Sequence, residues 1–137
     1  MKAPLLAAAL LLAACATTTG PVSLAGTAWQ LVKFQGGDGT TQTPDDGAKY
    51  TVEFLADGAV AMRIDCNRAR GAWKSAGPSQ LEFGPLAVTR VQCPPESLYD
   101  RFVKDVGNVR SYVIRNGHLY LALMADGGIY EFEPRKP

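Results

Sequence analysis

From residue 24 onward, short runs of alternating apolar and polar residues are separated by turn signals. Tyr50, Val52 and Phe54 alternate with polar neighbours, and a second alternating run covers residues 60–64. A period of two residues places successive side chains on opposite faces of a strand, so both runs are predicted to be half-buried β-strands. The Ala-Asp-Gly sequence at 56–58 predicts a turn that joins them into a hairpin.

The rest of the chain continues this pattern, with one exception. Further strands are predicted over residues 29–34, 71–75, 80–83, 111–115, 118–123 and 129–133. The exception follows Pro94-Pro95-Glu96, where apolar residues recur at helical spacing until Gly107-Asn108; these residues are Leu98, Phe102, Val103 and Val106. The predicted fold class is therefore mainly β with one α-helix, a small antiparallel barrel-like sheet of about eight strands with the helix packed on it.

The first fourteen residues have the features of a removable leader. Lys2 precedes an unbroken apolar run over residues 5–12, which is too short to cross a hydrocarbon core about 30 Å thick. The run ends in Ala13-Ala14-Cys15, which resembles the lipobox of bacterial lipoproteins, whose cysteine is acylated and becomes the new N-terminus. A plain secretory signal followed by a chance cysteine is the alternative.

These features divide the chain into three parts. We expect a lipoprotein-type signal peptide over residues 1–14, lipidated Cys15 with a short tether up to residue 23, and one domain over residues 24–137. The uncharged tether reaches roughly 30 Å at about 3.3–3.6 Å per residue. In bacterial lipoproteins an Asp after the cysteine favours the inner membrane. Ala16 occupies that position, so we expect a lipid anchor in the outer membrane, on the periplasmic side.

The charge balance bears on the class of partner. The chain has fourteen Lys and Arg against thirteen Asp and Glu, so its formal net charge is +1, and removal of Lys2 with the leader brings the side chains to zero. A neutral chain lacks the basic surface that binds nucleic acid, so no nucleic-acid partner is expected.

Two cysteines remain if Cys15 is acylated. Cys66 and Cys93 form an even number in an oxidising envelope, where a disulfide is favoured. Such a bridge would close a loop of about 28 residues and contribute roughly 3.5 kcal/mol; two buried free thiols are the alternative. If the strand over 60–64 continued, Cys66 would point to its apolar side. No metal site is expected, because His118 is the only histidine and no Cys-x-x-Cys spacing occurs.

Three segments resemble the META-domain (HslJ-like) family of bacterial lipoproteins. They are Leu-Ala-Gly-Thr-Ala-Trp at 24–29, Asp-Cys-Asn-Arg at 65–68 with Gly-Ala-Trp at 71–73, and Thr-Arg-Val-Gln-Cys-Pro at 89–94 with Glu96 and Phe102. The similarity extends over about residues 24–132, although Asp65 replaces the family's usual Gly. It implies a small antiparallel barrel-like fold with a packed helix and a setting of envelope stress or antibiotic tolerance, and it supplies no catalytic residues.

The titratable side chains do not form a recognisable catalytic set. A Ser-His-Asp triad needs a His that a carboxylate orients, whereas His118 follows a hairpin turn and is predicted to be an exposed turn residue. Glu53, Glu82 and Glu131 occupy outward strand positions, which favours solvated faces over a general acid/base pair. We therefore expect no enzymatic activity and no cofactor.

Four arginines around the two cysteine segments are the predicted binding surface. A disulfide would draw them to one end of the domain, where guanidinium groups could bind a carboxylate or phosphate bidentately. Ordinary surface charges that pair with Asp65 and Glu96 are the alternative. The four residues are Arg63, Arg68, Arg70 and Arg90.

Two functions fit these features. The first is a non-enzymatic, lipid-anchored envelope protein that supports envelope integrity or stress and antibiotic tolerance through an envelope protein or a peptidoglycan-layer partner. The second is a module that binds a small apolar ligand or lipid between sheet and helix. A filled, close-packed interior would rule out the second.

Overall fold

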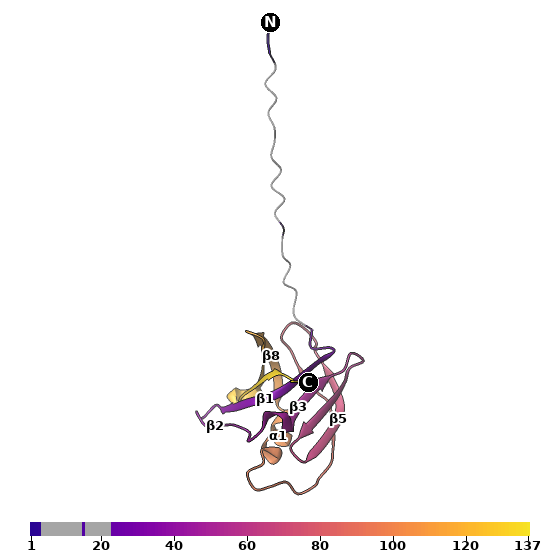
Figure 1. The fold of residues 1–137 in the computed structure, drawn as a ribbon, viewed down its shortest axis with the longest axis vertical. Coiled ribbons are helices and arrows are strands. Elements are labelled where there is room, and N and C mark those ends of the chain that lie inside the picture. Colours follow the sequence, from indigo (N-terminus) through magenta and orange to yellow (C-terminus); the bar gives the residue numbers. More distant parts are fainter. Residues whose placement is uncertain (4–14, 16–22) are drawn as a thin grey trace.

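The computed structural model describes residues 1–3, 15 and 23–137 (Figure 1). Over these residues the chain forms ten strands, one α-helix and two short 3-10 helices. The strands are β1 (Thr27–Gly36), β2 (Thr41–Gln42), β3 (Tyr50–Phe54), β4 (Ala59–Ile64), β5 (Asn67–Lys74), β6 (Glu82–Phe83), β7 (Ala87–Val88), β8 (Val109–Arg115), β9 (His118–Leu123) and β10 (Gly128–Pro134). The helices are α1 (Tyr99–Val106), η1 (Gly47–Lys49) and η2 (Met124–Asp126).

Eight of these strands follow one another across a single antiparallel sheet, in the order β6-β5-β4-β3-β1-β10-β9-β8. The two-residue strands β2 and β7 pair with β1 and β5. The two ends of the sheet also meet, because Leu81 N donates to Arg110 O at 3.1 Å and Tyr112 N donates to Ser79 O at 2.9 Å. The sheet is therefore a nearly closed barrel with one helix, which confirms the predicted fold class.

The interior of the barrel is filled by apolar side chains. Along β4, Val60, Met62 and Ile64 are buried while Ala61 and Arg63 face outward, as the period of two predicts. Among the described residues, the core cluster extends from Leu24 to Phe132, so residues 23–137 contain their own core. The largest fully buried side chains are Phe34, Phe54 and Phe132.

Helix α1 packs on aromatic residues of the sheet. The Phe102 ring meets the rings of Tyr130 and Phe132 edge-on, with centroids 5.3 and 6.4 Å apart. The helix begins at Tyr99, later than the expected opening at residues 94–96. The preceding residues form a turn instead, in which Ser97 N donates to Pro94 O at 3.0 Å.

The β4–β5 hairpin differs from the sequence expectation for Cys66. Ile64 pairs with Asn67, so Asp65 and Cys66 form a two-residue turn. Asp65 adopts a φ of +56°, a left-handed conformation that Asp tolerates better than most residues. The prediction that Cys66 points to the apolar side is therefore wrong: the strand ends before Cys66, which lies exposed in the turn.

The remaining differences concern the ends of elements. The strand expected over 71–75 begins four residues earlier, at Asn67, while β2 and β7 are too short to give a periodic signal. The Asn116-Gly117 turn forms as predicted, with φ values of +52° and +78°. In the part of the chain that the structure describes, no helix has the length and apolar character needed to span a membrane.

Candidate functional site

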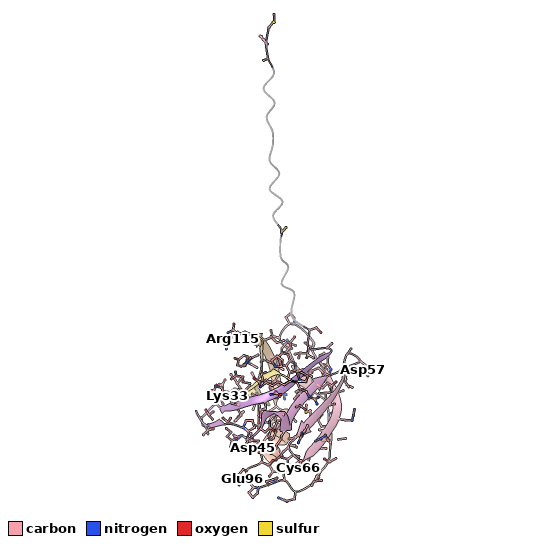
Figure 2. The ribbon with its side chains drawn as sticks, in the orientation of Figure 1. Lys33, Asp45, Asp57, Cys66, Glu96 and Arg115 are labelled. Atoms are coloured by element: carbon pink, nitrogen blue, oxygen red, sulfur yellow. A yellow bond between two sulfur atoms is a disulfide. The ribbon has the colours of Figure 1, made fainter. Side chains whose placement is uncertain are left out.

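A disulfide joins Cys66, in the β4–β5 turn, to Cys93, in the segment that leads to α1. The two Cα atoms are 5.7 Å apart and 27 residues apart in sequence. Cys93 is buried whereas Cys66 is exposed. Figure 2 shows Cys66 at the end of the domain opposite Asp57, which lies in the β3–β4 turn. The bridge therefore fastens residues 84–98, which we call the cysteine loop, to one end of the sheet.

Asn67 is a second attachment for the cysteine loop. Its side chain is fully buried. Its Nδ2 donates to Val91 O at 2.9 Å, and its Oδ1 accepts from Val91 N at 2.7 Å and from Thr89 Oγ1 at 2.8 Å. The amide thus substitutes for the backbone of a neighbouring strand. Asn67 belongs to the segment that resembles the family, but no role was predicted for it. A single sequence contains no signal for hydrogen bonds between a side chain and a distant loop.

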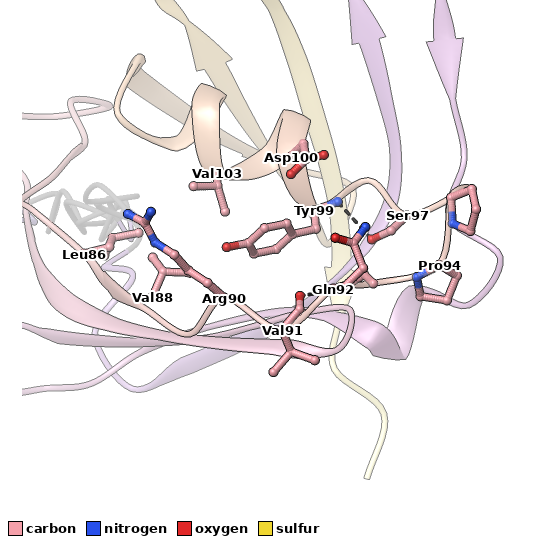
Figure 3. A pocket seen from close by; sticks show the side chains of 12 residues that line it. Leu86, Val88, Arg90, Val91, Gln92, Pro94, Ser97, Tyr99, Asp100 and Val103 are labelled. Carbon is pink, nitrogen blue, oxygen red and sulfur yellow. Dashed lines mark hydrogen bonds between the residues drawn. The ribbon is translucent and has the colours of Figure 1, made fainter.

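A groove of about 600 Å³, which we call the cysteine-loop groove, lies between α1 and the cysteine loop. Figure 3 shows Tyr99 and Val103 of α1 facing Leu86, Val88 and Arg90 from the opposite side. Tyr99 Oη donates to Thr89 O at 3.0 Å, which ties the helix to the loop. The groove therefore combines apolar side chains on both sides with charged groups, among them Arg90 and Asp100.

A second groove, of about 380 Å³, lies on the outer face of β3, β4 and β5, and we call it the arginine groove. Three of the predicted arginines line it, namely Arg63, Arg68 and Arg70, together with Arg135, which follows β10. Arg90 lines the cysteine-loop groove instead. The four predicted residues are therefore divided between two sites. Sequence reasoning missed Arg135 because it is distant along the chain.

The arginines of this groove make few contacts with the protein. Within residues 23–137, no carboxylate lies in ion-pair range of Arg63, Arg68, Arg70 or Arg135. Arg63 Nε donates to the backbone O of Asp65 at 3.1 Å, and Arg68 donates to the backbone O of Asn67 at 3.2 Å. The alternative, in which these arginines pair with the side chains of Asp65 and Glu96, is therefore not seen among the described residues.

His118 and Glu131 are less exposed than the sequence suggested. The Nδ1 of His118 lies 2.8 Å from Glu131 Oε1, and Lys33 Nζ lies 3.6 Å from Glu131 Oε2. Only 15% of the Glu131 side chain is exposed. The solvated position expected for Glu131 is therefore wrong, because neighbouring strands bring the two side chains together, whereas 35% of the His118 side chain stays exposed. Among the described residues, this site included, no three His, Cys, Asp or Glu side chains group closely enough to hold a metal ion.

Tyr130 connects α1 to β10 through a buried hydroxyl. Its Oη donates to Asp105 Oδ2 at 2.7 Å. Burial, assisted by this hydrogen bond, raises the pKa of Tyr130 well above that of a free tyrosine. The hydroxyl therefore stays protonated in the folded protein and holds the last turn of the helix.

The fold and the grooves define the class of protein, which is a small antiparallel β-barrel domain with one packed helix. A disulfide attaches the cysteine loop to one end of the barrel. The sequence matches the model of the META domain over residues 22–137. The chain belongs to the META-domain family, which is not known as an enzymatic family.

Solved structures show the same fold in other bacterial proteins. The NMR structure of a protein from Burkholderia xenovorans is similar with a TM-score of 0.71 and 20% identity, over 100% of this chain and 99% of that one. A DUF4847 family protein from Bacteroides vulgatus is similar with a TM-score of 0.62 and 17% identity, over 83% of this chain and 96% of that one. A search of curated proteins gave no match.

Proposed function

We propose that this protein is a lipoprotein of the cell envelope, anchored in the outer membrane through Cys15 with its META domain on the periplasmic side. The observation that carries the proposal is the order of the N-terminal segments. A lipoprotein-like leader ends at Ala14, Cys15 follows, and the buried core begins at Leu24. Each buried CH₂ of an acyl chain contributes about 0.8 kcal/mol, so several chains hold a protein durably at a membrane.

In this proposal the domain acts without catalysis and supports envelope integrity or stress and antibiotic tolerance through a partner. Leu24 lies beside Ala56, Asp57 and Gly58, at the β3–β4 turn. The disulfide and the cysteine-loop groove lie at the other end of β4. A domain tethered near Leu24 would therefore hold this groove away from its attachment, where an envelope protein or the peptidoglycan layer could meet it.

The test compares Cys15→Ser and Ala16→Asp in the native host. For the parent, we expect an intact mass equal to residues 15–137 plus acyl groups, and recovery with outer membranes. Cys15→Ser removes the acylated thiol, so this variant should leave the membrane fraction and the strain should lose its tolerance to envelope stress. Ala16→Asp keeps the thiol and should redirect the anchored protein to the inner membrane. Unchanged tolerance in the Cys15→Ser strain would contradict the proposal.

A second candidate function is the binding of an apolar ligand, at a different place from the one the sequence suggested. The barrel interior is filled by core side chains, which disfavours a ligand between sheet and helix. The cysteine-loop groove has the apolar residues Leu86, Val88 and Val103 in its walls. Native mass spectrometry of gently purified residues 23–137 should then show extra mass that denaturation removes and that Val103→Lys abolishes. A bare protein mass would contradict this candidate.

A further inference from the structure

The arginine groove is built from two rows of side chains that cross three strands. In the first row, Arg63 of β4 lies between Thr51 of β3 and Arg68 of β5. Ala61 occupies the middle of the second row, between Glu53 and Arg70. Because successive side chains alternate between faces, all six lie on the outer face of the sheet. The small side chain of Ala61 leaves the centre of this face hollow.

Arg63 and Arg68 are directly opposite each other on paired strands. Side chains in such a pair have Cβ atoms about 4.5–5.5 Å apart, and like charges placed this way are destabilising. No carboxylate among the described residues neutralises either of them. The fold therefore tolerates an electrostatic cost on this face that a bound anion would remove.

Arg135 brings a fourth guanidinium group to the groove from a distant part of the chain. Its backbone N donates to Ala28 O at 3.0 Å, which fixes the segment after β10 beside β1. The groove is then lined by four arginines and a single carboxylate, that of Glu53. Since the side chains of residues 23–137 balance to no net charge, this excess of positive charge is local.

We propose that the arginine groove binds phosphate groups, with Arg63 and Arg68 as the principal ligands. Arginine presents its N–H donors in a planar fork that matches phosphate oxygens bidentately. A phosphate offers enough acceptor oxygens to engage two opposed guanidinium groups together, whereas one carboxylate is satisfied by a single fork. This assignment does not depend on anchoring through Cys15 or on the cysteine-loop groove.

The experiment is a titration of residues 23–137, with the disulfide intact, by inorganic phosphate and pyrophosphate at low ionic strength. We expect saturable amide shifts on β4 and β5, tighter binding of pyrophosphate, and weakening as salt rises. Succinate, a dianionic dicarboxylate, is the control ligand. Arg68→Gln and Arg63→Gln should each weaken pyrophosphate binding about tenfold, because a charge-assisted bond is lost.

Arg90→Gln is the matched control variant, since Arg90 lines the other groove. It should bind pyrophosphate like the parent. The melting temperature of Arg68→Gln should equal or exceed that of the parent, because the substitution removes a like-charge contact, and this separates lost binding from lost folding.

Vesicles distinguish a lipid headgroup from a soluble phosphate as the source. Retention of residues 23–137 on phosphatidylglycerol vesicles, with release by pyrophosphate, would identify headgroups. Pyrophosphate binding without retention would identify a soluble ligand, and both results support the phosphate site. The proposal is overturned if neither phosphate nor pyrophosphate binds at millimolar concentration, if succinate binds as tightly as pyrophosphate, or if Arg90→Gln weakens binding as much as Arg68→Gln.

Discussion

Around α1, the rings of Phe34, Tyr130 and Phe132 pack with Phe102 in the core, whereas the cysteine loop contributes one buried side chain, Cys93. The loop is attached by the disulfide, by the hydrogen bonds of Asn67 and by the two residues of β7. The region around α1 is thus held mainly by apolar packing, and the loop by a few specific bonds.

This difference indicates that the two regions respond to different perturbations. Apolar packing is distributed over many contacts and does not depend on redox conditions. A loop held by one covalent bridge, one buried amide and a few further hydrogen bonds loses much of its support when the bridge or the amide is removed. The cysteine-loop groove, which the loop helps to form, should therefore depend on oxidation, while the barrel should not.

The largest effect is expected for Phe132→Ala in the packed region. Phe132 is fully buried beneath α1, so its truncation should lower the free energy of unfolding by about 3–5 kcal/mol. Urea denaturation measures this change. Ile129→Ala on the same strand is the control, because Ile129 is exposed and its truncation should alter stability by no more than about 0.5 kcal/mol. Equal losses for the two variants would contradict the assigned core.

Loss of the disulfide should destabilise the protein slightly less than truncation of Phe132. Cys66→Ser should lower the free energy of unfolding by about 3.5 kcal/mol in oxidising buffer, because the bridge restricts the unfolded chain. In the presence of reductant, the melting temperature of the parent should fall to that of the variant. If reductant left the melting temperature of the parent unchanged, the bridge would contribute nothing to stability.

Asn67→Ala should cost about 2–3 kcal/mol, because it leaves buried polar groups of the cysteine loop without partners. Asn67→Asp should not restore stability, since a carboxylate cannot donate to Val91 O. The control is Asn108→Ala, whose amide makes one exposed 3.5 Å contact and should matter little. In a double mutant with Cys66→Ser the two losses should not add, because both act on one loop. Additive losses would contradict this coupling.

Tyr130→Phe should cost about 1 kcal/mol at neutral pH, through loss of the hydrogen bond to Asp105. The pKa of Tyr130 is raised in the folded state, so above about pH 10 the unfolded chain releases a proton that the folded protein retains. The parent should therefore lose stability as pH rises past this point, and the variant should lose less. If urea denaturation showed the same pH dependence of stability for the parent and for Tyr130→Phe above about pH 10, the raised pKa of Tyr130 would be refuted.

The smallest effect is expected at the turn that presents Cys66. Asp65 has a φ of +56°, a conformation that Gly adopts without strain. Asp65→Gly should raise the free energy of unfolding by at most about 0.5 kcal/mol. Glycine relieves the backbone strain at this position, but the greater conformational entropy of glycine in the unfolded chain offsets most of the gain. Gly117→Ala, at φ +78° with open space around it, is the reverse control and should cost about 1 kcal/mol. A loss above about 1 kcal/mol for Asp65→Gly would show that its carboxylate has a structural role.

Local patterns were enough to predict most of the fold. The alternation in β3, β4 and β9, the Asn116-Gly117 turn and the apolar stripe of α1 are short-range signals, and the structure contains each of them. The start of α1 was misplaced because a hydrogen bond from Leu98 N to the distant Tyr50 hydroxyl helps to hold the preceding turn. Long-range contacts of this kind leave no periodic trace in a sequence.

The candidate sites were predicted less completely, for the same reason. The two cysteines could be paired by counting, but the role of Asn67 depends on a loop more than twenty residues away. The arginines were grouped by their nearness to the two cysteines, which a disulfide was expected to bring together. Strand register instead separates Arg90 from Arg63 and adds Arg135, which is 65 residues beyond Arg70.

The most direct test of the contrast between the two regions is backbone ¹⁵N relaxation of the oxidised and reduced domain. Reduction should lower amide order parameters from about 0.85 to below about 0.6 at Gln92, Cys93 and Glu96, the residues around Pro94-Pro95 that carry a backbone N–H. Residues 89 and 91, which Asn67 still holds, should change less, and β1, β9 and β10 should stay rigid. Unchanged order at these three amides, or an equal loss of order throughout the barrel, would contradict the contrast between the two regions.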